Sequence, residues 1–247
     1  MVESVLILAG QRAGVVDPLC EATGVSHKAE IMVAGEPMLQ RVARALDAAG
    51  LPVPHISGYA GSAFQEVPSG DGPADSVLLG LEAIDKFPCL LTTCDHALLT
   101  VEMVQSFIAG AVKTGTDICV GFATEDVIQT AYPKTKRTYL RFSDQAVSGC
   151  NLFYIASAEG LKAIRFWQAV QHLRKKPLKL ARKVGIGVGI KYALGRLSLQ
   201  GAFDYAAKRI GGIKAAPVLL PYAEAAIDVD KPADLDLVET IIAGRVK

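Results

Sequence analysis

Short apolar runs alternate with longer stretches over the first half of the chain, and in those stretches apolar residues recur every three or four positions. The short runs contain β-branched residues, which favours buried strands. The longer stretches are typical of amphipathic helices. The predicted strands are residues 5–8, 54–58, 89–93 and 117–123, and the predicted helices are residues 37–49, 74–86 and 101–113. This alternation predicts βαβ units, and therefore an α/β fold with a doubly wound, mostly parallel sheet.

The pattern changes after residue 121. The segments TYLRF and NLFYI alternate like strands of a mixed or antiparallel region. Residues 158–211 are helical in pattern for most of their length, and we interpret them as a helical insert within a single domain of residues 1–247. The segment APVLLPY predicts a last strand. A closing helix is expected to begin near Pro232, because proline is tolerated in a first helical turn.

Composition narrows the class of protein. A chain of 247 residues, 51% hydrophobic and 21% charged, can bury the core of one large α/β domain. Its net charge of +1 argues against nucleic acid as a partner, because nonspecific binding to phosphate backbones rests on a strongly basic face. No apolar stretch approaches the roughly 20 residues that a membrane span requires.

The five cysteines form no C-x-x-C pair, so a zinc site is not expected. Three of them lie in or beside apolar runs, where cysteine behaves as a small hydrophobic residue. An odd number of cysteines without a signal peptide fits a reducing compartment. We therefore predict buried thiols and a cytoplasmic location.

The first forty residues contain the most informative chemistry. The apolar segment ESVLILAG runs into Gln11 and Arg12, and Lys28 follows in SHKAEIMVAGEPML. A loop that leaves the carboxyl end of a parallel strand can direct backbone N–H groups at phosphates, while cationic side chains neutralise the charge. This order of strand, glycine turn, arginine and lysine predicts a site for a nucleoside triphosphate.

Aspartates follow two other predicted strands. Asp95 comes directly after LLTTC, where a divalent cation bound to phosphates would stabilise its carboxylate; the alternative is a helix cap. Asp228 and Asp230 are two residues apart on an extended segment, so both can face one ion, although capping and turn formation are equally open. Asp234 is interpreted as a first-turn charge favoured by the helix dipole.

Two further segments have both a binding and a structural interpretation. Asp75 and Ser76 begin a predicted helix, where they either contact a nucleobase or cap the helix, and capping is favoured. The segment PKTKRTYLRF contains Arg137 and three other cations, which either bind an acceptor phosphate or protect a strand edge. His27 and His96 are interpreted as packing or hydrogen-bonding residues.

Five segments in this order resemble the nucleotidyltransferases of the MobA-like superfamily. They are LAG with Arg12 and Lys28, then DSVLLGL, TTCDHALLT, GCNLFY and DVDKPADL. The superfamily includes molybdenum-cofactor guanylyltransferase, methylerythritol-phosphate cytidylyltransferase and sugar-phosphate nucleotidyltransferases. The resemblance covers most of the chain except the helical insert. It implies a Rossmann-like fold of the nucleotide-diphospho-sugar transferase type.

The resemblance also implies roles for individual residues. A triphosphate would lie against the first loop, Asp95 would bind the metal, and Asp230 would be the second metal ligand, with Asp228 as the competing residue. The implied catalytic residues are Arg12, Lys28 and Asp95. The implied nucleotide-binding residues are Leu8, Ala9, Gly10, Gln11, Arg12, Lys28, Asp75, Ser76 and Asp95, and the acceptor-binding residues are Arg137, Gly149 and Asn151.

The first loop departs from the family pattern, because Gln11 stands where a second glycine is usual and the stretch before Lys28 is long. We expect a Mg²⁺-dependent transfer of a nucleoside monophosphate, with CTP slightly favoured over GTP, to a phosphorylated small molecule or lipid precursor. Pyrophosphate would be released. The alternatives are a nucleotide-sugar glycosyltransferase and a non-catalytic nucleotide-binding protein, neither of which releases pyrophosphate.

The segment RKKPLKLARKVGIGVGIKYALGRL is strongly basic. It is interpreted as a solvated helix pair that covers the site, as a subunit interface of a homodimer, or as a surface for anionic lipid. The first two interpretations are favoured. Its cations are Lys175, Lys176, Lys179, Arg182, Lys183, Lys191 and Arg196.

Overall fold

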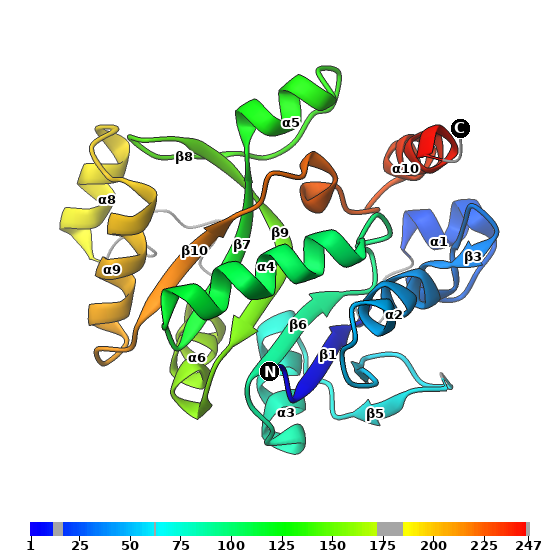
Figure 1. Cartoon of the computed structure of the whole chain (residues 1–247), viewed down its shortest axis with the longest axis horizontal. Helices are drawn as coiled ribbons and strands as arrows, with labels where there is room; N and C mark the ends of the chain where they lie inside the picture. The colour runs from blue at the N-terminus through cyan, green and yellow to red at the C-terminus, as the bar shows by residue number, and fades with distance from the viewer. Residues whose placement is uncertain (12–16, 62, 172–184, 246–247) are drawn as a thin grey trace.

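A central sheet organises the computed structural model, which describes residues 1–11, 17–61, 63–171 and 185–245. Within these residues the strand order is β10-β7-β9-β6-β1-β4-β5, with β8 beside β9 (Figure 1). The strands are β1 (Ser4–Leu8), β4 (His55–Ser57), β5 (Gln65–Val67), β6 (Cys89–Thr93), β7 (Ile118–Thr124), β8 (Leu140–Arg141), β9 (Ala146–Ile155) and β10 (Ala215–Leu219). A separate two-stranded hairpin is formed by β2 (Met32–Val33) and β3 (Glu36–Pro37).

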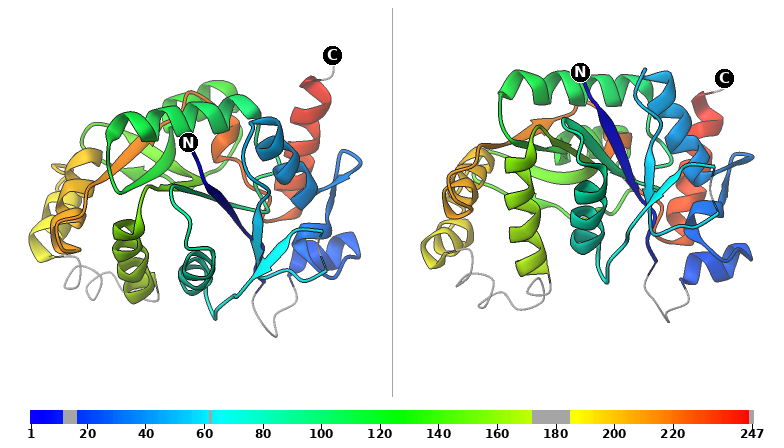
Figure 2. Two further views of the ribbon diagram at one scale, coloured as in Figure 1. Left: turned by 60° about the horizontal axis from the view of Figure 1, so that its bottom comes forward. Right: turned by 90° about the horizontal axis from the view of Figure 1, so that it is seen from below.

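Helices cover both faces of the sheet (Figure 2). Helices α2 and α4 lie on one face, and α3, α6 and α9 lie on the other. The described helices are α1 (Pro18–Thr23), α2 (Met38–Ala48), α3 (Pro73–Ile84), α4 (Val101–Thr114), α5 (Glu125–Ala131), α6 (Leu161–Val170), α8 (Ile186–Ala193), α9 (Leu199–Arg209) and α10 (Pro232–Arg245). Single 3-10 turns occur at η1 (Lys28–Glu30), η2 (Ala158–Gly160) and η4 (Ala223–Ala226).

Strand β1 explains why both faces are covered. Val5 and Ile7 pack with α2 and α4, whereas Leu6 packs with α3 and α6. Successive side chains of a strand point to opposite faces, so an uninterrupted apolar run requires a cover on each side. The predicted α/β fold with a doubly wound, mostly parallel sheet is confirmed, and the strands and helices predicted in the first half agree with the structure to within two residues at each end.

Strand β9 is antiparallel to both of its neighbours. It pairs with β6 on one side and with β7 on the other, while β1, β4, β5 and β6 are parallel to one another. The segment NLFYI of the predicted mixed region therefore lies inside the sheet, and TYLRF contributes the short strand β8, which pairs with β9. Helices α6 and α9, from the predicted insert, pack against the sheet face and β10. Residues 172–184 of that insert lie outside the described residues.

Two further predictions concern burial and membranes. All five cysteines are free and buried, as their apolar surroundings predicted. In the described ranges, no helix has both the length and the apolar character needed to cross a membrane.

A core substitution tests the packing of α4 on the sheet. Phe107 is fully buried in α4, and its ring lies against Gly121 of β7. We expect Phe107→Ala to lower the free energy of unfolding by about 3–5 kcal/mol, because it leaves a cavity beneath the helix. Urea denaturation would measure this loss.

Val112→Ala is the matched control, because Val112 lies on the exposed side of the same helix. Its free energy of unfolding should change by no more than about 0.5 kcal/mol. Equal losses in the two variants would contradict the packing described here.

Candidate active site

The carboxyl ends of β1 and β6 bring two loops together at one edge of the sheet. These strands are parallel neighbours, and Leu8 pairs with Thr93 at their ends. Beyond them, the backbone N–H of Cys94 donates to the carbonyl of Leu8 over 2.9 Å. Ligands of doubly wound sheets bind outside these strand ends. The loop after β1 and the segment that carries Asp95 therefore form one continuous edge.

The loop after β1 passes close to the end of β4. The N–H of Ala9 donates to the carbonyl of Ser57 over 2.8 Å, so the first N–H groups beyond the sheet belong to Gly10 and Gln11. A Cβ at Gly58, whose φ is +89°, would lie 2.5 Å from the Cα of Gly10. Glycine at position 58 therefore lets the two loops touch.

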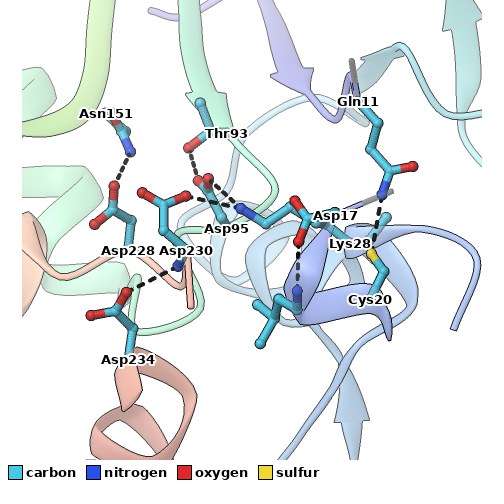
Figure 3. A network of polar contacts seen from close by, with 12 residues as sticks. Gln11, Asp17, Cys20, Lys28, Thr93, Asp95, Asn151, Asp228, Asp230 and Asp234 are labelled. Carbon is cyan, nitrogen blue, oxygen red and sulfur yellow. Dashed lines mark hydrogen bonds and ion pairs between the residues drawn. The ribbon is translucent and has the colours of Figure 1, made fainter. Parts of the chain in front are cut away.

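Gln11 does not extend away from the protein. Its amide contacts the sulfur of Cys20 over 3.1 Å, while Asp17 caps α1 by accepting from the N–H of Leu19 over 2.9 Å (Figure 3). The contact with Cys20 ties Gln11 to α1. Arg12 lies outside the described residues.

Asp95 is held at the end of β6. Its side chain is largely buried and accepts a hydrogen bond of 2.5 Å from the hydroxyl of Thr93. Its own carbonyl accepts from the N–H of Val229 over 3.0 Å. The helix-cap alternative for Asp95 is wrong, because α4 begins later and its N-cap is Thr100, which accepts from Met103.

Lys28 reaches from η1 between two carboxylates. Its Nζ lies 2.9 Å from Oδ1 of Asp230 and 3.7 Å from Oδ2 of Asp95 (Figure 3). The packing of α10 with α1 and with the segment around Ile31 brings residues so distant in sequence to one place. One ammonium group thus balances two acids from different parts of the chain.

Electrostatic attraction explains why Lys28, Asp95 and Asp230 stay together. Burial raises the pKa of Asp95, and the nearby charges of Asp228 and Asp230 raise it further, while Lys28 and Thr93 oppose the increase. For Lys28, burial favours the neutral amine, but the carboxylates of Asp95 and Asp230 prevail and raise its pKa above the usual value. Lys28 is therefore cationic at neutral pH.

Asp228 is held differently from Asp230. It forms an ion pair with Arg137, and the amide of Asn151 approaches its other oxygen at 3.5 Å. The side chain of Asp228 is 29% exposed, whereas that of Asp230 is 61% exposed. Both acids are near the edge, but only Asp230 combines exposure with a contact to Lys28. Asp230 is thus better suited than Asp228 to take up a metal ion.

Arg137 secures the segment that carries these acids. Besides Asp228, its Nε donates to the carbonyl of Ala226 over 2.9 Å, and its guanidinium lies 3.7 Å from Asp234. Asp234 in turn accepts from the N–H of Asp230 over 3.3 Å and is buried. The interpretation of Asp234 as a first-turn charge missed this contact. Arg137, expected at an acceptor phosphate, is instead largely buried against protein groups.

The two expected acceptor residues lie in an irregular part of β9. Phe122 of β7 pairs with Gly149, but Val120 pairs with Phe153, so β9 has extra residues between the two pairs. Asn151 lies in this bulge with a φ of +49°. The bulge turns its amide toward Asp228, while Gly149 is exposed and has open space around its Cα.

Asp75 and Ser76 lie at the start of α3, but neither caps it. The N-cap is Gly72, with no side-chain hydrogen bond, so the favoured capping interpretation is wrong. Asp75 accepts from Gln168 over 2.6 Å and from Gln171 over 3.0 Å, and the bond from Gln168 is the main reason that its pKa is lowered. Asp75 therefore joins α3 to α6.

Ser76 fixes the glycine-rich loop before α3. Its hydroxyl accepts from the N–H of Gly70 over 3.0 Å, and its backbone N–H donates to the carbonyl of Gly72 over 2.9 Å.

His27 and His96 both have packing environments. His96 is buried, which lowers its pKa to about 4, and the ring of His27 lies 4.5 Å from that of Tyr59.

The carboxylates suit a hard divalent cation. Asp95 and Asp230 already converge on one positive charge, and carboxylate oxygens are ligands that Mg²⁺ prefers. In the described part of the chain, no three acidic, histidine or cysteine side chains form a complete metal cluster. The protein thus offers two carboxylates, which suits Mg²⁺ because this ion usually keeps waters and shares substrate phosphates.

Comparison with known proteins identifies the family of this chain. The model of the MobA-like NTP transferase domain matches residues 5–140. The chain belongs to the MobA-like NTP transferase family. It is therefore a nucleotidyltransferase by family, and its strand-end loop, Lys28 and Asp95 lie within the matched residues. None of the curated proteins matches the sequence significantly.

Solved structures similar to this MobA-like transferase extend over nearly its whole length. A hypothetical transferase from Thermus thermophilus is 32% identical with a TM-score of 0.83, and the match covers 95% of this chain and 100% of that one. Molybdopterin-guanine dinucleotide biosynthesis protein A from Archaeoglobus fulgidus is 12% identical with a TM-score of 0.53, covering 98% and 99%.

A third structure, 2-C-methyl-D-erythritol 4-phosphate cytidylyltransferase from Thermus thermophilus, is 14% identical with a TM-score of 0.53. That match covers 98% of this chain and 100% of the other. At these low identities the second and third structures show a shared fold.

The buried charge of Asp95 should lower stability. Because its folded pKa lies above the unfolded value, ionisation costs folding free energy as the pH rises through the folded pKa. Asp95→Asn removes that charge and keeps an oxygen for Thr93. We expect the variant to be more stable than the wild type at pH 7.

Urea denaturation at pH 7 and at progressively lower pH would measure the difference between the two proteins. The gap should narrow on acidification, because the carboxyl group then becomes neutral in both states. A variant that is less stable at pH 7 would contradict the electrostatic account.

Proposed function

We propose that this chain transfers a nucleoside monophosphate from CTP, in preference to GTP, to a phosphorylated small molecule or lipid precursor in the cytoplasm. The reaction requires Mg²⁺ and releases pyrophosphate. The observation that carries this proposal is the convergence of Lys28, Asp95 and Asp230 beside the loop after β1. That arrangement combines a cation for phosphate with carboxylates for a metal, at the sheet edge where nucleotides bind.

The chain's own residues supply binding and charge. The backbone N–H groups of Gly10 and Gln11 follow the last sheet hydrogen bond of β1 and bind the triphosphate. Lys28 leaves its carboxylate partners when phosphate arrives and neutralises the departing pyrophosphate. Mg²⁺ held by Asp95 and Asp230 would stabilise charge on the phosphates.

The acceptor needs no general base. A phosphate monoester has a second pKa of about 6, so its oxygen is already ionised near neutral pH. This oxygen attacks the α-phosphorus, and the bond from that phosphorus to the bridging oxygen breaks as pyrophosphate leaves. Gly149 and Asn151, on the β9 bulge beside Asp228, orient the acceptor for attack.

The preference for CTP rests on two kinds of support. The D-S-V segment at Asp75 and Ser76 resembles that of the cytidylyltransferase branch. A CMP:2-keto-3-deoxy-manno-octonic acid synthetase solved with CTP shares the fold, at 13% identity and a TM-score of 0.55, with 98% of this chain and 100% of that one covered. Family membership favours nucleotidyl transfer over the glycosyltransferase and non-catalytic alternatives.

Pyrophosphate release from CTP, GTP, UTP and ATP, with and without Mg²⁺, would test the proposal. Phosphorylated sugars and polyols would be supplied as acceptors. We expect CTP to be the best donor and Mg²⁺ to be essential. Asp95→Asn should lower the rate by at least about 100-fold, because it removes a charge that stabilises the transition state.

The control for this loss is Asp47→Asn, which changes an exposed carboxylate on α2 and should leave the rate unchanged. Full activity of Asp95→Asn would contradict its assignment as a metal ligand. Loss of activity in both variants would indicate a general defect rather than a specific one.

Arg137 is expected to position Asp230 through the segment that it secures. Arg137→Gln should raise the Mg²⁺ concentration for half-maximal rate by about 10–100-fold, the usual effect of losing a residue that supports a metal ligand. CTP binding without metal should change much less. Titration of Mg²⁺ in the pyrophosphate assay would measure the effect.

Arg44→Gln is the matched control, because Arg44 also pairs with a carboxylate, that of Glu36, but on the surface. Arg137→Lys keeps the charge and should lie between the wild type and Arg137→Gln. An unchanged Mg²⁺ requirement in Arg137→Gln would rule out a positioning role.

A further inference from the structure

Helix α8 has apolar residues on two opposite sides. Val188 is buried on the inner side, and Tyr192 packs at 5.6 Å against the ring of Phe142. On the outer side, Ile186, Ile190 and Leu194 are 60%, 54% and 62% exposed. Their spacing of four residues places all three in one stripe along the helix. A helix that needs only one apolar face for packing thus presents a second one to its surroundings.

The pose of α8 is fixed by contacts on its inner side. The hydroxyl of Tyr192 accepts from the N–H of Arg141 in β8 over 3.2 Å. Gly185, at the start of α8, lies so close to α9 that a Cβ there would overlap the hydroxyl of Tyr205. These contacts prevent the helix from rotating its outer stripe inward. Figure 1 shows α8 beyond α9 at one end of the molecule.

Two exposed cations lie beside this stripe. Lys191 and Arg196 are exposed on and just after α8, and neither has an acidic ion-pair partner among the residues that the structure describes. In the sequence, no Asp or Glu occurs between Glu159 and Asp204, whereas the same interval contains the basic segment with Lys175 and Lys183. In the sequence, this interval therefore contains much of the positive charge of a chain whose net charge is only +1.

We propose that the outer face of α8, defined by Ile186, Ile190 and Leu194, docks onto an anionic lipid bilayer. Aliphatic side chains would enter the boundary between headgroups and acyl chains, and flanking cations would attract the anionic headgroups. Three side chains on a short helix are too small a patch for a stable protein interface, which buries about 800 Å² per partner. They suit a reversible contact with a membrane surface.

The docked face is connected to the proposed acceptor side of the site. Tyr192 holds Arg141, which pairs with Ala146 at the start of β9, and β9 continues to Gly149 and Asn151. A bilayer at α8 would thus lie at the end of the strand that carries the acceptor residues. The docking inference itself does not depend on the proposed reaction.

Vesicle sedimentation with the full chain would test the docking. Vesicles of phosphatidylcholine alone would be compared with vesicles that contain about 30% phosphatidylglycerol, an anionic content whose surface potential attracts basic segments. The wild type should sediment with the anionic vesicles only. The double variant Ile186→Ser/Ile190→Ser should bind them at least about tenfold more weakly, because two apolar side chains are lost.

Two controls keep the result specific. Val112→Ser changes an exposed apolar residue on α4, far along the chain from α8, and should bind like the wild type. The midpoint of thermal unfolding, measured without ligand for each protein, should be equal in wild type and variants, so a loss of vesicle binding cannot come from misfolding.

Three results would overturn the proposal. The first is no binding of the wild type to anionic vesicles. The second is binding that the serine variant retains in full, which would place the contact elsewhere. The third is a wild-type dimer that the serine variant converts to a monomer without any vesicle binding, because α8 would then be an interface between copies of the chain.

Discussion

The burial of negative charge at one edge of the sheet constrains the rest of the structure. Asp95 is largely buried, and Asp228 and Asp230 lie close enough to raise its pKa. Like charges in such a place need cations, and the part of the chain that the structure describes provides two in separate positions. Lys28 faces Asp95 and Asp230, whereas Arg137 faces Asp228. The fold can therefore be understood as the scaffold that brings these pairs together from distant segments.

Arg137 and Lys28 differ in the kind of groups that hold their side chains. Arg137 is fixed by a carbonyl and two carboxylates, which makes its segment a rigid support. Among the described residues, the ammonium of Lys28 contacts two carboxylates, one of which is well exposed. Arg137 thus pairs with Asp228 and Asp234 of DVDKPADL, whereas Lys28 pairs with Asp230, which lies between them.

The sequence pattern predicted those features that depend on residues close together in the chain. The strands and helices of the first half follow from the burial of alternate or periodic positions. Asp95 was a candidate because it directly follows a strand, and Lys28 because it follows the strand, glycine turn and arginine of the first loop. The contact of Arg137 with Asp228 joins residues 91 positions apart, so no pattern near either one indicates it. Asp75 was misinterpreted for the same reason, since its partners belong to α6 and the residue after it. The position of β9 depends on pairing between distant strands.

The central position of β9 also has a consequence for synthesis. Strands β1, β4, β5 and β6 can pair as they leave the ribosome, but β7 has no sheet neighbour until β9 and later β10 emerge. During that interval one edge of β6 and both edges of β7 are unpaired and apolar, which is the condition that favours association with other chains. Nascent chains that have synthesised β7 but end before residue 155 therefore expose these unpaired edges, which chaperones can cover.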